Sequence, residues 1–229
     1  MKYRTWRAMG NQRGFNLVEL AIVIVIVGLL IGGLVTPLST QQDIAKRAHT
    51  GNQLQEIHDA LLGYAARTGR LPCPATATSA GESSPSLATN ACTSYNGFVP
   101  ARTLDLDGSF DNNSLLLDDW LNPVRYSLTS ASGGAFSNTL TLALVPDLQI
   151  CAESACTTVL ANTAVAVVYS TGEDGTTTTS ADQLENMDDD NVFVTRTISE
   201  ATGAEFDDQV VWMSPNTLVF QLVRAGRVN

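Results

Sequence analysis

The chain has 229 residues, with 13 basic and 23 acidic side chains and a formal net charge of −10. Proteins that bind nucleic acid use Lys and Arg to neutralise phosphates, so this balance argues against a nucleic-acid partner. The length leaves room for one domain of ordinary size besides an N-terminal segment.

The N-terminal segment reads as a basic leader followed by a membrane helix. Residues 1–14 contain four basic side chains and no acid, which predicts a cytoplasmic N-terminus. The run Leu20–Val35 is uncharged, and a helix over residues 15–35 would span about 31 Å, close to the roughly 30 Å of bilayer hydrocarbon. No good Ala-x-Ala cleavage site follows it. We therefore expect a single membrane crossing at residues 15–37.

One acidic residue, Glu19, stands at the head of this apolar run. A carboxylate within a membrane costs on the order of 2.5–3.5 kcal/mol on insertion scales, so its presence indicates a function that needs a cationic partner. The alternative is a side chain that reaches the membrane edge and has no partner.

The octapeptide Arg13-Gly14-Phe15-Asn16-Leu17-Val18-Glu19-Leu20 resembles the N-terminal signature of type IV pilins and type II secretion pseudopilins. In that family a prepilin peptidase cuts between the residues that match Gly14 and Phe15, and N-methylation of the new Phe amine follows. The resemblance implies a mature chain that begins at Phe15, with a net charge of −14. It also implies that Glu19 meets the Phe15 ammonium of a neighbouring subunit, an attraction that is strong at low dielectric.

The function implied by this resemblance is structural. The protein would be a minor or specialised pilin or pseudopilin of a type IV pilus or a type II secretion pseudopilus. Its partners would be other subunits, through their N-terminal helices, the prepilin peptidase and an inner-membrane assembly platform. It would lie in the bacterial inner membrane with its C-terminal domain exported, and then enter a filament. The alternative is an exported binding domain or enzyme that uses residues 15–37 only as an anchor, for which neither Glu19 nor Gly14-Phe15 is needed.

The helix is expected to continue beyond the membrane as an amphipathic segment, residues 38–70. Apolar residues recur there at spacings of three and four. Gly69, followed by Pro72, is a typical stop signal, which predicts one helix from Phe15 to Thr68. The globular domain would then comprise residues 71–229.

All four cysteines lie in the predicted exported part, where disulfides persist. Three pairings are possible in principle, and we favour Cys73 with Cys92 and Cys151 with Cys156, since each pair brackets one loop. Zinc binding is the competing explanation, but no Cys-x-x-Cys spacing occurs and no histidine lies nearby.

The globular domain is expected to be an antiparallel β-sheet that the long helix covers on one face, an α+β plan typical of pilin-like folds. Trp120 and Trp212 are expected in its core. A short terminal helix is predicted at residues 215–226. The predicted strands are residues 124–129, 139–145, 164–170, 192–198 and 209–213.

The chemistry of the domain is restricted to carboxylates. Both histidines, His49 and His58, precede it, so a Ser or Cys nucleophile would lack its usual base, and we predict no enzymatic activity. Major pseudopilins hold calcium in a loop among their late strands, and this resemblance makes calcium the one candidate cofactor. Clustered acids are also common as solvated turns, and no twelve-residue calcium loop occurs. The candidate ligands are Asp174, Asp188, Asp189 and Asp190.

Overall fold

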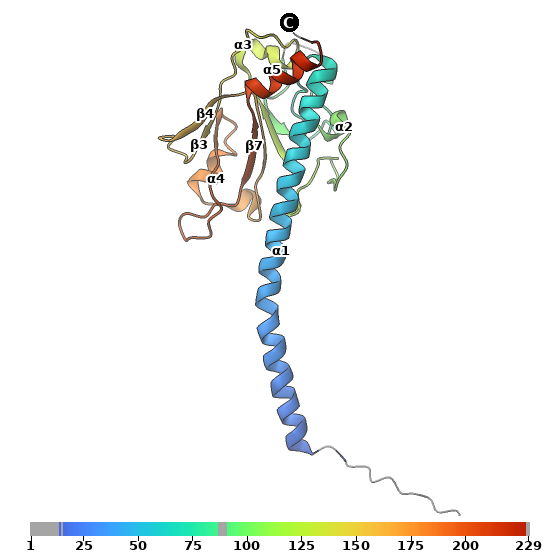
Figure 1. Cartoon of the computed structure of the whole chain (residues 1–229), viewed down its shortest axis with the longest axis vertical. Helices are drawn as coiled ribbons and strands as arrows, with labels where there is room; N and C mark the ends of the chain where they lie inside the picture. Colours follow the sequence, from blue (N-terminus) through green and yellow to red (C-terminus); the bar gives the residue numbers. More distant parts are fainter. Residues whose placement is uncertain (1–13, 15, 87–90, 228–229) are drawn as a thin grey trace, which may run out of the picture. The chain divides into compact units, whose positions relative to one another are not determined.

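The structure, a computed structural model, describes Gly14, residues 16–86 and residues 91–227, apart from the side chains of residues 31–39. The chain divides into two units, residues 1–45 and residues 46–229. The first helix, α1 (Leu17–Thr68), contributes to both units (Figure 1).

In the first unit, α1 begins just after Asn16. The backbone carbonyl of Asn16 accepts a hydrogen bond from the Leu20 amide at 3.1 Å, and its side-chain oxygen accepts one from the Val18 amide at 3.4 Å. Asn is a preferred residue at this position, because its side chain satisfies an amide that the helix leaves without a partner. The predicted start at Phe15 lies outside the described residues.

In the second unit, α1 presents one apolar stripe to the domain core. Leu54, Ile57, Leu61 and Ala65 are buried, at the spacing of three and four that the sequence predicted. The helix ends at Thr68, where Gly69 adopts a positive φ of 75° and donates a hydrogen bond to the Ala65 carbonyl. The predicted end of the helix is therefore confirmed.

The larger sheet is antiparallel, with strand order β1-β2-β5-β7. In its register Tyr126 lies opposite Val168, and Val168 lies opposite Val211. Three of its strands were predicted. The four strands are β1 (Asn96–Phe98), β2 (Arg125–Leu128), β5 (Ala166–Ser170) and β7 (Gln209–Met213).

A second sheet, with order β4-β3-β6, was not predicted. It comprises β3 (Leu148–Cys151), β4 (Val159–Ala164) and β6 (Val192–Val194). Because β3 and β6 run parallel, the expectation of one purely antiparallel sheet is wrong. The domain is nevertheless a mixture of helices and mainly antiparallel strands, as expected.

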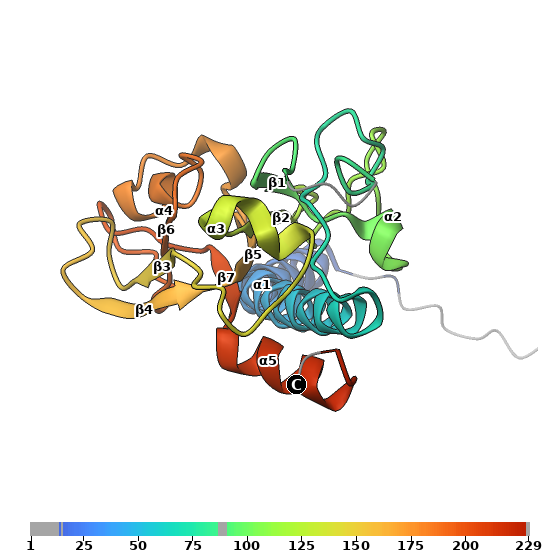
Figure 2. The ribbon, with the colours of Figure 1, turned by 90° about the horizontal axis from the view of Figure 1, so that it is seen from above.

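Strand β5 lies between two hydrophobic cores. Ala166 and Val168 face the core formed with α1 and the terminal helix, whereas Val167 and Tyr169 face the core of the second sheet, where the ring centre of Tyr169 lies 5.7 Å from that of Phe193. Alternate residues of a strand point to opposite faces, so one strand supplies both cores. Figure 2 shows β5 between α1 and the second sheet.

Two expectations about this domain fail. Residues 139–145 form no strand, because only Leu140 is buried, and its amide bonds the Gly69 carbonyl next to the end of α1. Trp212 is not a core residue, since it remains 36% exposed. The strand predicted at residues 192–198 ends at Val194.

The terminal helix α5 (Pro215–Arg224) matches its prediction. Ser214 accepts a hydrogen bond from the Thr217 amide at 3.1 Å and Pro215 occupies the first turn, as helix starts prefer. Leu218 and Leu222 are buried on one face. The other helices are α2 (Ala101–Leu104), α3 (Ala131–Gly134) and α4 (Ala181–Glu185), with short 3₁₀ turns η1 (Ala135–Ser137) and η2 (Gly175–Thr177).

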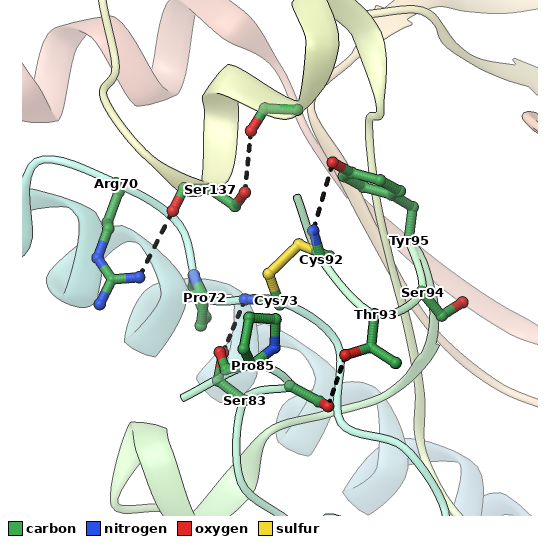
Figure 3. Close-up of a disulfide and its surroundings, with 12 residues drawn as sticks. Arg70, Pro72, Cys73, Ser83, Pro85, Cys92, Thr93, Ser94, Tyr95 and Ser137 are labelled. Atoms are coloured by element: carbon green, nitrogen blue, oxygen red, sulfur yellow. Dashed lines mark hydrogen bonds between the residues drawn. A yellow bond between two sulfur atoms is a disulfide. The ribbon is translucent and has the colours of Figure 1, made fainter. Parts of the chain in front are cut away.

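Both predicted disulfides are present, Cys73–Cys92 and Cys151–Cys156. Figure 3 shows the first disulfide with Ser83, which lies within the loop between Cys73 and Cys92, and Tyr95, which lies just beyond it. Ser83 Oγ accepts a hydrogen bond from the Cys73 amide at 3.0 Å, and the Tyr95 hydroxyl accepts one from the Cys92 amide at 3.4 Å. The loop is therefore anchored by polar contacts as well as by the covalent bond.

Candidate functional site

The first candidate site is the N-terminal end of α1. Gly14 is exposed, whereas Phe15, the predicted new N-terminus and methylation site, lies outside the described residues. Glu19 is in the first turn of the helix and is exposed. Among the described residues none forms a hydrogen bond or ion pair with its carboxylate, which is therefore available to a partner from outside the chain.

The surface around Glu19 is apolar on every side of the helix. Leu17 is 83% exposed and Leu29 is 72% exposed, and the side chains between them are also open. A helix that is hydrophobic all round is typically buried against other helices or lipid. A carboxylate in the first turn is also favoured by the positive end of the helix dipole.

Within the described part of the chain, no helix combines the length and the apolarity that crossing a membrane requires.

The second candidate site is an acidic cluster at the end of α4. One carboxylate oxygen from each of Glu185, Asp188 and Asp190 lies within 4.8 Å of the other two. The Asn96 side chain donates to the Asp189 carbonyl at 2.5 Å, and the Val192 amide donates to Asp190 Oδ1 at 2.6 Å. These contacts hold the loop in a defined shape.

The electrostatics of this cluster are those of acids held close together. Burial and, to a lesser degree, the charges of neighbouring acids raise the pKa of Glu185 above its ordinary value. Burial also raises the pKa of Asp188, with Asp190 and Asp189 adding to the effect. Calcium takes six to eight oxygen ligands, so these three carboxylates together with water suit that ion chemically. Exposed acidic groups also occur commonly without a metal.

The four predicted calcium ligands do not come together in one group. Asp188 and Asp190 join Glu185, which the sequence did not single out, while Asp189 is not part of that group. Asp174 instead shares the Gln183 amide with Asp207, at 3.3 Å and 2.5 Å. The sequence signal for Glu185 would have been its position one helical turn before Asp188.

The cluster around Asp174 is more deeply buried. Asp207 Oδ2 accepts hydrogen bonds from the amides of Glu173 at 2.5 Å and Asp174 at 3.2 Å. Burial, followed by the charge of Asp174, raises the pKa of Asp207. Burial raises the pKa of Asp208 to about 7, although its hydrogen bond with Asn186 acts in the opposite direction. These carboxylates are occupied in joining the loop after β5 to the start of β7.

Asn186 closes the edge of β6. Its side-chain amide donates to the Val194 carbonyl at 3.1 Å and accepts from the Val194 amide at 2.7 Å, as one residue of an added strand would. The same amide donates to Asp208 Oδ2 at 2.7 Å. This residue thus links the second sheet to the buried acids.

A polar cleft lies beside α1 in the second unit. His49 Nδ1 lies 3.0 Å from Asp119 Oδ1 there, and Glu56 and Asp107 also line it. Asp118 is fully engaged in the adjoining turn, because it accepts from Ser170 Oγ at 2.5 Å and from the amides of Trp120 and Asn122. Burial raises the pKa of Asp118. The arrangement explains the shape of the turn and supplies no activated nucleophile.

Comparisons with known proteins found no matching family model, no matching curated protein and no matching solved structure.

Proposed function

We propose that the protein is a structural subunit of a bacterial filament, a minor or specialised pilin or pseudopilin. A prepilin peptidase would cleave it after Gly14, and it would assemble through its N-terminal helix. The observation that carries the proposal is Glu19, an acid without an internal partner among the described residues, in the first turn of α1, where the stretch up to Leu30 is otherwise apolar, and five residues after the proposed cut.

The proposed assembly would bring two opposite charges together in an apolar environment. Cleavage before Phe15 creates an ammonium group at the same end of the helix that holds Glu19. In a packed bundle of such helices in lipid, residues 15–37 would be surrounded by apolar groups, so each charge is costly alone. Pairing the ammonium of one subunit with Glu19 of the next offsets both costs and fixes their register.

The exported domain supports the same proposal. It has its own core, two disulfides and a strongly acidic composition, which suit a soluble surface outside the cytoplasm. No catalysis is required of it. Because the domain is large, we assign it to a minor or specialised subunit, in either a type IV pilus or a type II secretion pseudopilus.

The first test is mass spectrometry of the N-terminus of the purified protein. We expect a chain that begins with N-methylated Phe15. An intact Met1, or a cut after residue 37, would contradict the proposal and favour an exported binding domain or enzyme that uses the helix only as an anchor.

The second test is Glu19→Val. We expect normal cleavage and membrane insertion but at least about a tenfold loss of incorporation into filaments, because the Phe15 ammonium loses its partner. Glu19→Asp, which keeps the charge, should retain part of the incorporation. Glu56→Gln changes an exposed acid later in the same helix and should have no effect. Normal incorporation of Glu19→Val would remove the role proposed for this residue.

A further inference from the structure

The charges of the exported domain are separated along the chain. Residues 171–208 contain eleven acidic residues and one basic residue, Arg196. By contrast, residues 60–81, 126–146 and 209–227 contain no acid at all. The cations in these three segments are Arg67, Arg70, Arg224 and Arg227.

The elements that carry the four arginines and the region of α4 lie apart in the domain. The C-terminal turns of α1 and helix α5 lie side by side, and α4 with the loops around it lies away from them in both views (Figures 1 and 2). Arg227 joins the two basic elements directly, since its Nε donates to the Ala66 carbonyl at 3.0 Å. We call the four arginines the basic end and residues 171–208 the acidic end.

The arginines of the basic end are held by aromatic rings and carbonyls. The guanidinium carbons of Arg67 and Arg70 lie 5.5 Å and 5.9 Å from the ring centre of Tyr64, and that of Arg224 lies 5.6 Å from Phe220. Among the described residues, none of the four forms an ion pair. Elsewhere in the domain arginines do, as in the contact of Arg196 with Asp182 at 2.8 Å.

The basic end also exposes apolar side chains. Phe220 is 62% exposed and Val223 is 53% exposed, on the face of α5 that does not contact the core. Exposed aromatic residues beside arginines are the composition that protein interfaces favour. Arginine in particular recognises carboxylates through paired hydrogen bonds.

The acidic end is complementary to this surface. Glu173 and Asp188–Asp190 are exposed, and Leu184 beside them is 46% exposed. The raised pKa of Glu185 reflects burial and then repulsion from neighbouring acids, which an approaching cation would relieve. One domain therefore carries both halves of a complementary pair of surfaces.

We propose that the basic end of one copy docks on the acidic end of a second copy. The two surfaces differ, so the contact is head-to-tail and can repeat into an open chain. This inference deepens the proposed function by naming a contact between exported domains, and it rests on that function only for its place in a filament. The mature chain is acidic overall, so a random collision is repulsive and the contact depends on this specific alignment.

A charge-swap experiment tests the docking with the full-length protein in detergent. The basic-end variant is Arg67→Glu with Arg224→Glu, and the acidic-end variant is Glu173→Lys with Asp189→Lys. Sedimentation velocity at low salt should show self-association weakened at least about tenfold in each variant, because each substituted side chain then faces a like charge instead of an opposite one. An equal mixture of the two variants should recover most of the lost association, since the substituted positions of one variant again face opposite charges on the other. High salt should weaken the self-association of the parent protein.

The control variant is Lys46→Glu with Arg102→Glu, which changes the net charge equally but lies outside the basic end. It should associate nearly as well as the parent, and an equal loss would attribute the effect to net charge and overturn the docking. Arg67→Gln with Arg224→Gln provides a milder variant, and thermal melting verifies that each variant folds. A mixture that fails to restore association between folded variants also overturns the proposal.

Further outcomes separate this inference from the proposed function. If the N-terminus is processed and filaments form, but the charge variants associate as the parent does, the docking is wrong and the filament function stands. If the leader is intact and the mixture still restores association, the docking is supported and the filament function is wrong. Binding to phosphatidylglycerol vesicles that requires the basic end, without self-association, would replace the second copy by a lipid surface.

Discussion

At the scale of single residues, Asp208 is the most informative acid of the second unit, residues 46–229. Its carboxyl group is buried, with 3% of its surface exposed, and burial raises its pKa to about 7. A buried acid of this kind favours its neutral form when the protein is folded. In the unfolded chain the same group ionises at an ordinary value of 3.8, so folding becomes linked to pH.

We expect Asp208→Asn to flatten the pH dependence of stability. The folded pKa exceeds the unfolded one, so the contribution of Asp208 is complete below about pH 4 and is lost as the pH rises through about 7. One such proton gives a slope of about 1.4 kcal/mol per pH unit. Urea unfolding of the parent and of Asp208→Asn at several pH values measures this slope. The uncharged amide should make the variant the more stable protein at about pH 8, where the parent must bury a carboxylate.

An exposed acid provides the control for this experiment. Asp105→Asn replaces the same chemical group at an exposed site after α2 and provides the comparison. Part of the slope should survive in Asp208→Asn, since Asp207 also has a raised pKa. Equal slopes in the parent and in Asp208→Asn would show that Asp208 is not the linked group.

The candidate residues could be predicted only where one residue is exceptional in its own sequence context. Glu19 is exceptional because an acid interrupts an apolar run. Glu185 is not, because it lies on α4, a five-residue helix without apolar periodicity. Asn186 is important only because β6 lies beside it in the fold, and the sequence around Asn186 does not indicate that neighbour.

At the scale of elements, the loop closed by Cys73 and Cys92 joins the end of α1 to the first strand. The two cysteines are 19 residues apart, whereas Cys151 and Cys156 are 5 apart. A longer loop loses more chain entropy when it is closed, so its disulfide stabilises the fold more in the chain-entropy description.

Replacing Cys73 and Cys92 by Ser should therefore lower the free energy of unfolding by about 3 kcal/mol, and replacing Cys151 and Cys156 by about 2 kcal/mol. Denaturant unfolding of the two double variants measures both values under identical conditions. Reducing agent should bring the parent close to the combined effect. A larger loss from the short loop would indicate that local contacts, and not loop length, determine the effect.

Elements were predictable where their signal is local. The end of α1 follows from Gly69, and α5 follows from Ser214 and Pro215. The parallel pairing of β3 with β6 joins Ile150 to Phe193, 43 residues apart, and no local pattern reports it. Strand β4 was missed because Val159–Ala164 lacks alternation of apolar and polar residues.

At the scale of the whole second unit, one strand couples two cores. All residues of β5 are buried, and a strand that is apolar on both faces is typical of a sheet covered on both sides. That signal is present in the sequence and argues for a second layer, although not for the strands that form it.

Because β5 belongs to both cores, we expect that a cavity in either core lowers the midpoint of a single unfolding transition of the whole unit. Leu61→Ala, in the core with α1, and Ile150→Ala, in the core with the second sheet, should each cost about 3 kcal/mol. Tryptophan fluorescence and far-ultraviolet circular dichroism should report the same midpoint for each variant. Two separate transitions in Ile150→Ala would show that the second sheet unfolds independently.

The placement of positive and negative segments would also give the second unit a permanent dipole moment. Two such domains exert a torque on each other before their surfaces touch, and this torque acts over about the Debye length, roughly 8 Å at physiological ionic strength. Copies that dock as proposed would thus be rotated into one preferred orientation during diffusion. The unequal distribution of four arginines and eleven acids would therefore affect how fast copies find each other, as well as how tightly they hold.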